Sequence, residues 1–206
     1  MASDATRDPV NDHLLTPHNA ALVVVDYQPS QVQAVASMDR DLLVDNIVSV
    51  ARLARTFDLP VVLSTVNVTD GQGPTIPELR AVLADCAEID RTAINSWEDA
   101  EFRGAVEATG RKKLIMAALW TETCLVFPAL DALRDGFDVY PVVDAVGGTS
   151  PDAHRAGLDR IVHAGAQPIG WVTLAGELQR DWNRVATVAD VVDIVLTTRM
   201  PATGRL

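Results

Sequence analysis

The chain has 206 residues, of which 48% are apolar, and its 28 acidic and 17 basic side chains give a formal net charge of −11. This acidity argues against partners that present phosphate backbones or anionic lipid, so we expect neither nucleic-acid nor membrane binding. The length suits a single domain over residues 1–206, with a polar lead-in at 1–18 and a tail at 198–206.

Two features of the sequence bear on the cellular compartment. Residues 1–19 lack the apolar core of a secretory signal, and no apolar run reaches the roughly 18–20 residues that a membrane helix needs. The two cysteines, Cys86 and Cys124, are too few for a disulfide framework in a chain of this length. We therefore expect a cytoplasmic protein with reduced thiols.

The first half of the chain alternates between strand and helix. The apolar run at 21–25 is typical of a strand that is buried on both faces. Helical spacing of apolar residues predicts a helix at 41–57, and a second strand is expected at 61–66. Glycines and prolines indicate a loop at 70–77, which leads into a short helix at about 77–83.

The middle of the chain carries a weak strand signal and a strong one. The short apolar stretch 87–89 is a candidate edge strand. Ser96, with Asp99 three residues later, resembles a capping box and predicts a helix that runs to about Ala108. The apolar run at 113–119 is the third strong strand.

The remaining elements continue the alternation. In chain order, we expect a helix at 123–134, a strand at 137–143, a helix at 151–163, a strand near 167–172, a helix near 174–182, and a helix or a strand at 188–197. Pro141 is unusual inside a strand because it has no N–H donor. Repeated βαβ units predict an α/β fold with a mainly parallel, doubly wound sheet. The working site of such a sheet lies at the carboxyl ends of its strands.

Three residues at expected strand ends could carry chemistry. Asp26 follows the first strand directly, where partial desolvation would raise its pKa and make it a better base, although turn and cap aspartates are common there. Cys124 stands at the start of a helix, which favours a thiolate and lowers the thiol pKa, although most free cysteines are simply small buried residues. Arg91 would lie at the same edge of the sheet if 87–89 forms a strand. Without that strand, Arg91 is best interpreted as a solvated surface arginine. Cys86 lacks such a context, so we interpret it as structural.

Metal and phosphate motifs give little signal. The four histidines are not spaced as metal ligands; they are His13, His18, His154 and His163. No glycine-rich phosphate loop of the Walker or Rossmann kind is present.

Three stretches of the sequence carry a family resemblance: ALVVVDYQ at 21–28, RTAINSW at 91–97 and LIMAALWTETC at 114–124. Together and in this order, they resemble the isochorismatase-like cysteine hydrolases. The likeness spans about residues 18–185, and GPTIPEL at 73–79 with ELQRDW at 177–182 is most similar to the YcaC-like branch. The resemblance implies a three-layer αβα sandwich and an Asp–Lys–Cys catalytic triad.

The resemblance assigns roles to individual residues. Asp26 and Cys124 fall at the Asp and Cys positions of the triad, and Arg91 falls at the Lys position, as it does in the YcaC-like branch. Arginine keeps its charge, so Arg91 can orient groups and stabilise negative charge but cannot shuttle a proton. The family also implies a cis peptide at Leu119–Trp120, with the backbone N–H groups of Trp120 and Cys124 forming an oxyanion hole.

Other implications concern metal, substrate and assembly. Family nicotinamidases bind a metal through an Asp-x-His motif, but the corresponding loop here, 67–72, has no histidine, so we expect no metal and no other cofactor. Residues near the matched motifs that could line a substrate pocket, or merely pack, are Gln28, Asn67, Trp97, Trp120 and Phe127. Relatives form tetramers or octamers, and contacts could come from the helix at 41–57 and from residues 187–206.

These observations predict a cysteine-dependent hydrolase that cleaves an amide C–N bond of a small molecule through a thioester. Two alternatives stay open at this point. One is isochorismatase-type hydrolysis of a vinyl ether, which needs no nucleophilic cysteine. The other is a non-catalytic thiol, redox or binding protein, since an activated Cys124 would also oxidise readily.

Overall fold

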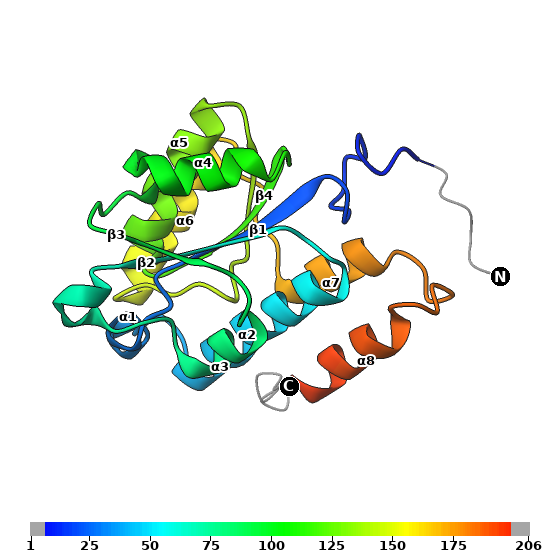
Figure 1. The fold of residues 1–206 in the computed structure, drawn as a ribbon, viewed down its shortest axis with the longest axis horizontal. Helices are drawn as coiled ribbons and strands as arrows, with labels where there is room; N and C mark the ends of the chain where they lie inside the picture. The colour runs from blue at the N-terminus through cyan, green and yellow to red at the C-terminus, as the bar shows by residue number, and fades with distance from the viewer. Residues whose placement is uncertain (1–6, 199–206) are drawn as a thin grey trace.

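A parallel sheet lies at the centre of the computed structural model, which describes residues 7–198 (Figure 1). In the described residues, its strands follow the spatial order β3-β2-β1-β4-β5, and all neighbouring pairs are parallel. The strands are β1 (Ala20–Val25), β2 (Val61–Val66), β3 (Glu88–Arg91), β4 (Lys113–Ala118) and β5 (Asp138–Pro141). Every residue of the central strand β1 is buried, which agrees with its unbroken apolar sequence.

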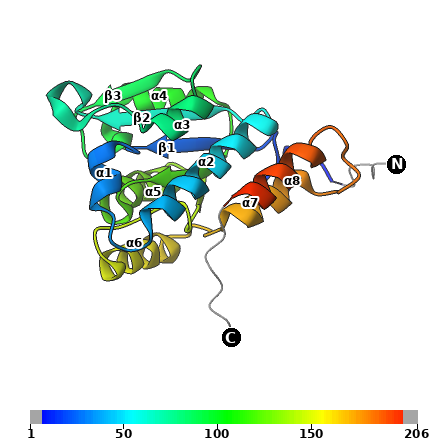
Figure 2. The same cartoon turned by 90° about the horizontal axis from the view of Figure 1, so that it is seen from below.

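Helices cover both faces of this sheet, so the predicted three-layer α/β architecture is confirmed. α2, α3, α7 and α8 lie on one side, and α4, α5 and α6 lie on the other (Figures 1 and 2). The helices are α1 (Pro29–Ala34), α2 (Arg40–Thr56), α3 (Pro77–Val82), α4 (Ala100–Ala108), α5 (Val126–Arg134), α6 (Pro151–His163), α7 (Trp171–Gln179) and α8 (Val188–Thr197). Three shorter helical turns are η1 (Val68–Gln72), η2 (Ser96–Glu98) and η3 (Thr121–Leu125).

Pro141 is accommodated because of its position in the edge strand β5. The N–H groups of Asp138 and Val142 donate to the carbonyls of Lys112 and Met116 on the β4 side. Pro141 therefore falls at an alternate position, where its nitrogen faces away from β4 and no ladder hydrogen bond is lost.

Two predicted elements are wrong in detail. The helix expected from Ser96 begins at Ala100, because the Asp99 carboxylate accepts from the N–H of Phe102 and is itself the N-cap, whereas Ser96 opens the separate turn η2. The strand expected near 167–172 is a single bridge between Val142 and Ile169, since helix α7 already begins there.

Other elements were left open or were not predicted. The segment at 188–197 is a helix, α8. Helix α1 and the helical turn η1 were not predicted, because both are too short to show a 3.6-residue period. The expected helix at 123–134 is divided into η3 and α5, and this division places Cys124 before the α-helix proper.

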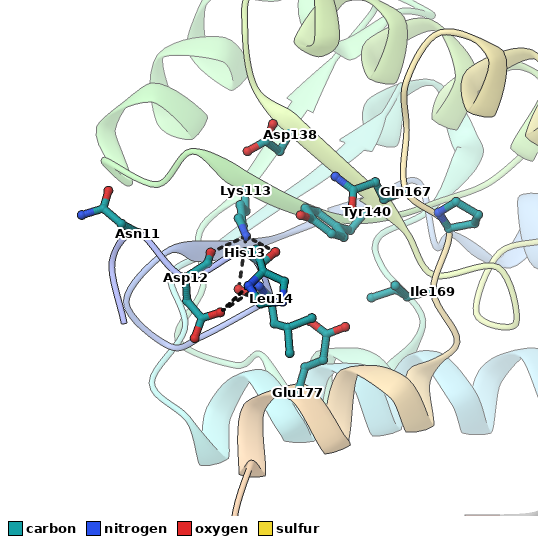
Figure 3. A pocket seen from close by; sticks show the side chains of 11 residues that line it. Asn11, Asp12, His13, Leu14, Lys113, Asp138, Tyr140, Gln167, Ile169 and Glu177 are labelled. Atoms are coloured by element: carbon teal, nitrogen blue, oxygen red, sulfur yellow. Dashed lines mark hydrogen bonds and ion pairs between the residues drawn. The ribbon is translucent and has the colours of Figure 1, made fainter. Parts of the chain in front are cut away.

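The lead-in is bound to the sheet over its described part. The ammonium group of Lys113, at the start of β4, donates to the carbonyls of Asp12 at 2.8 Å, His13 at 2.6 Å and Leu14 at 3.1 Å (Figure 3). These contacts border a cavity of about 500 Å³ at the amino ends of β4 and β5, opposite the edge that carries Asp26. Residues 1–6 of the predicted lead-in and 199–206 of the predicted tail lie outside the described residues.

Within the part of the chain that the structure describes, no helix combines the length and the apolar character that crossing a membrane would require.

Candidate active site

Three predicted residues meet at the carboxyl edge of the sheet. Asp26 follows β1 in a left-handed conformation with φ 62°, and its N–H donates to the carbonyl of Ser64 in β2 at 2.9 Å. Arg91 is the last residue of β3, and Cys124 lies in η3, shortly after β4. Parallel pairing of β1 with β2 and β4, and of β2 with β3, aligns these strand ends, so sequence-distant residues become neighbours.

Asp26 and Arg91 form a fully buried, bidentate ion pair. Arg91 Nη1 donates to Asp26 Oδ1 at 2.7 Å, and Nη2 donates to Oδ2 at 2.8 Å. A further bond runs from Nη1 to the carbonyl of Thr65 at 2.9 Å. Burial alone would lower the pKa of Arg91, but the hydrogen bonds and the charge of Asp26 raise it above its ordinary value. The guanidinium is therefore a permanent cation held on the carboxylate.

The Cys124 thiol faces that carboxylate. Burial raises the pKa of Cys124, and the negative charge of Asp26 and the hydrogen bond to its carboxylate raise it further, to about 12. The hydroxyl of Thr123 lies 3.6 Å from Sγ and opposes this effect, as does the charge of Arg91. The expected lowering of the thiol pKa is therefore wrong: burial and a neighbouring carboxylate outweigh any help from the helix terminus, which begins only at Val126.

Asp26 and Cys124 open onto a cavity of about 420 Å³. Its described lining comes from α1, the β2 end with η1, the segment after β3, and the segment after β4. The lining residues are Asp26, Ser30, Gln31, Ala34, Val66, Asn67, Gln72, Thr92, Ile94, Leu119, Trp120, Thr123 and Cys124. A volume of this size falls in the range of small-molecule sites.

Two of the five predicted pocket residues, Asn67 and Trp120, line this cavity. Gln28 does not: its fully buried amide binds the backbone of Val66 in both directions and the carbonyl of Gly73.

Trp97 and Phe127 belong to the packing of the layer formed by α4 and α5. The Trp97 ring packs edge-on against Phe102 and Phe137, and its Nε1 donates to Asp135 Oδ2 at 2.8 Å. Phe127 packs against the hydrophobic core. The structure therefore gives both residues a packing role instead of a place in the cavity wall.

Sequence reasoning missed a group of neutral polar residues in the wall. Ser30 Oγ donates to Gln31 Oε1 at 2.7 Å, and both side chains bond Gln72 Oε1. The indole N–H of Trp120 donates to the carbonyl of Gln31 at 2.9 Å, which ties the wall to the turn that carries Cys124. The only signal for these residues was their nearness in sequence to Asp26 and to the loop after β2.

Two further expectations concern the backbone and metal ligands. The peptide bond between Leu119 and Trp120 is cis, as the resemblance implies. Among residues 7–198, no group of three or more His, Cys, Asp or Glu side chains is placed to hold a metal ion. His154 is engaged elsewhere, with Nδ1 2.8 Å from Thr121 Oγ1.

The isochorismatase domain model matches residues 20–172, a range that includes Asp26, Arg91 and Cys124. The chain belongs to the isochorismatase family. This isochorismatase-family chain is 40% identical over 169 residues to the probable hydrolase YcaC of Escherichia coli, a match that covers 82% of this chain and 81% of YcaC.

Solved structures agree with this assignment. E. coli YcaC, described as an octameric hydrolase of unknown specificity, has a TM-score of 0.84 and 38% identity, and the match covers 89% of this chain and 91% of that one. YcaC from Pseudomonas aeruginosa, solved with hexane-2,5-diol and covalent acrylamide, has a TM-score of 0.81 and 35% identity, with coverage of 90% and 96%. The predicted resemblance to YcaC-like proteins is confirmed, and the protein is an isochorismatase-family hydrolase.

Proposed function

We propose that the protein hydrolyses an amide C–N bond of a small molecule, with Cys124 as nucleophile and Asp26 as general base. One observation carries the proposal: the Cys124 thiol and the Asp26 carboxylate lie in the wall of the same ligand-sized cavity, where the carboxylate helps to raise the pKa of the thiol. A nucleophile that faces its own base is the arrangement that covalent catalysis needs.

The first half of the reaction forms a thioester. Asp26 accepts the thiol proton while Sγ attacks the amide carbonyl carbon. The backbone N–H groups of Trp120 and Cys124 then bind the oxyanion of the tetrahedral intermediate. When the C–N bond breaks, Asp26 returns the proton to the leaving nitrogen, and ammonia or an amine departs.

The second half releases the acid. A water molecule gives a proton to Asp26 and attacks the thioester carbonyl, the C–S bond breaks, and the thiol is reprotonated. Arg91 cannot act as an acid or base, because its charge is permanent. Its two hydrogen bonds hold both carboxylate oxygens in place and stabilise the charge on Asp26.

The raised pKa of the thiol fits this scheme. With a pKa of about 12, only about one thiol in 10⁵ is ionised at pH 7. Attack therefore requires proton transfer to Asp26 at the moment the substrate is in place, rather than a stored thiolate. P. aeruginosa YcaC was solved with covalent acrylamide, a small primary amide, so that relative has room for a molecule of this substrate class.

The test is ammonia release from a panel of small primary amides. Wild type, Cys124→Ala and Asp26→Asn are compared with Cys86→Ala, a matched control at the other thiol. We expect release by wild type and by Cys86→Ala, and a loss of at least about 10³-fold in the other two. Full activity of Cys124→Ala on an amide would overturn the cysteine mechanism.

A vinyl-ether hydrolase of the isochorismatase type is the competing enzyme, and it predicts pyruvate release from isochorismate that survives Cys124→Ala. A redox or binding protein predicts no release from any substrate.

We also propose that the protein is a homo-oligomer, a tetramer or an octamer, in the cytoplasm. The octameric state of E. coli YcaC supports the assembly, at 38% identity over most of both chains. Light scattering coupled to size exclusion tests it, and a monomer at working concentration would contradict it.

A further inference from the structure

The charges around the catalytic cavity are already paired. Among the described lining residues, Asp26 is the only one with a charged side chain. Both of its carboxylate oxygens accept from Arg91, which is the nearest cation and is fully buried behind it. The ion pair is neutral overall, and its anionic member faces the cavity.

Arg91 is not available to a ligand. Besides Asp26, its guanidinium donates to the carbonyl of Thr65 at 2.9 Å and lies 3.4 Å from Ser64 Oγ and from the carbonyl of Ile94. Recruiting Arg91 to a substrate carboxylate would leave the buried Asp26 carboxylate without its partner, which is a costly state.

The rest of the wall is apolar or polar without charge. Ala34, Val66, Leu119 and Trp120 provide apolar contact surface. Ser30, Gln31, Asn67, Gln72 and Thr92 provide hydroxyl and amide groups, which bind a carbonyl or an amino group equally well. This set matches an uncharged amide and has no counter-charge for an ion.

We propose that the site selects primary amides of short, uncharged aliphatic acids and rejects substrates that carry a carboxylate. The inference rests on the proposed amide hydrolysis and names its substrate class. A substrate carboxylate would lose its hydration in a cavity whose described lining offers no cationic side chain to pair with it. An ammonium group would meet a carboxylate that Arg91 already neutralises, so cationic amides gain nothing that offsets their desolvation.

A matched pair of substrates tests the preference for uncharged over anionic amides directly. Levulinamide and succinamate have nearly the same shape, but the first ends in a methyl ketone and the second in a carboxylate. We expect kcat/KM to be higher for levulinamide by on the order of 100-fold or more. Equal values, or a preference for succinamate, would overturn the proposal.

An alkylation experiment separates this inference from the proposed hydrolysis. Cys124 is labelled with neutral iodoacetamide and with anionic iodoacetate in a Cys86→Ala background, and the ratio of the two rates is compared with that of 2-mercaptoethanol. We expect the ratio at Cys124 to favour iodoacetamide by a further factor of about 10 or more. That result with no amide hydrolysed would refute the enzyme but keep the charge selection. Equal ratios at Cys124 and 2-mercaptoethanol would refute the charge selection even if amides are hydrolysed.

The exposed rim residue Ile94 allows a gain-of-function test. Its side chain lines the cavity while the residue is 64% exposed, so a longer polar side chain is tolerated there. Ile94→Arg is compared with Ile94→Gln, which adds polarity without charge. We expect arginine, relative to glutamine, to shift the iodoacetate-to-iodoacetamide ratio several-fold toward iodoacetate. The same ratio in both variants would show that charge does not govern entry and would overturn the proposal.

Discussion

Replacing Asp26 by Asn should make Cys124 more reactive as a thiol and useless as a catalyst. The Cys124 pKa of about 12, against an ordinary 9.0, means that the folded site disfavours the thiolate by about 4 kcal/mol. Burial is the first cause, and the charge and hydrogen bond of Asp26 come next. Removing the carboxylate also leaves the Arg91 cation free to stabilise a thiolate, so the pKa must fall.

The assay is the pH profile of Cys124 alkylation by iodoacetamide, in a Cys86→Ala background. For wild type, the logarithm of the rate should rise with pH through pH 10 without a plateau. For Asp26→Asn, the profile should level off at a lower pH, and at pH 8.5 the rate should exceed that of wild type by about tenfold or more. Ammonia release by the same sample should fall by at least about 10³-fold, because the proposed base is removed.

Stability needs its own control, since Asp26→Asn leaves a buried arginine unpaired at a cost of about 3–5 kcal/mol. The double variant Asp26→Asn, Arg91→Gln removes both charges, and its profile should level off between those of wild type and the single variant. Circular dichroism verifies folding. If the folded single variant still shows no plateau below pH 10, Asp26 does not oppose the thiolate, and the electrostatic reasoning fails.

Three other predictions follow from named contacts. Arg91→Lys keeps the charge but loses the bidentate geometry, so kcat should fall by about tenfold, and Arg91→Gln should lower it by at least about 100-fold; equal rates in steady-state assays would contradict this. Lys113→Met removes three hydrogen bonds to backbone carbonyls, so the free energy of unfolding in urea should fall by about 2–3 kcal/mol with kcat unchanged; an unchanged midpoint would contradict the role of Lys113. Burial lowers the pKa of His154, so below about pH 6.5 the unfolded chain binds a proton more readily than the folded chain, and the free energy of unfolding should fall as the pH drops. The free energy of unfolding of wild type, relative to that of His154→Gln, should therefore fall with pH, and parallel curves of unfolding free energy against pH for the two proteins would refute this effect of His154.

The sequence predicts the frame of the site well, because each part of the prediction depends on local signals. Apolar runs locate the central strands, and the rule that parallel sheets work at their carboxyl ends selects Asp26 and Cys124 without any structure. Arg91 is harder to select, since β3 is only four residues long and its signal is weak. Its place beside Asp26 comes from sheet pairing across 65 residues of sequence.

The cavity wall could not be predicted in the same way. Gln31 and Gln72 come from α1 and η1, elements too short to show a periodic pattern, and they meet only in the folded chain. Gln28 was predicted to line the pocket because it is close to Asp26 in the sequence. In the structure, its amide instead forms hydrogen bonds with the backbone N–H and carbonyl of Val66. A buried amide whose hydrogen bonds are all formed within the protein has a structural role, and the sequence alone does not show which partners a buried side chain will have.

The raised pKa of the Cys124 thiol favours the proposed hydrolase over a redox protein. Redox-sensing cysteines are accessible thiolates with a low pKa, which react readily with peroxide. Burial and the Asp26 carboxylate raise the pKa of the Cys124 thiol to about 12, so we expect peroxide to oxidise this sulfur slowly at neutral pH. Asp26, which adds to the effect of burial on this pKa, is also the base that we propose removes the proton when a substrate carbonyl arrives. Slow oxidation by peroxide combined with rapid turnover of an uncharged amide is therefore the signature expected of this site, and a redox sensor would show the reverse.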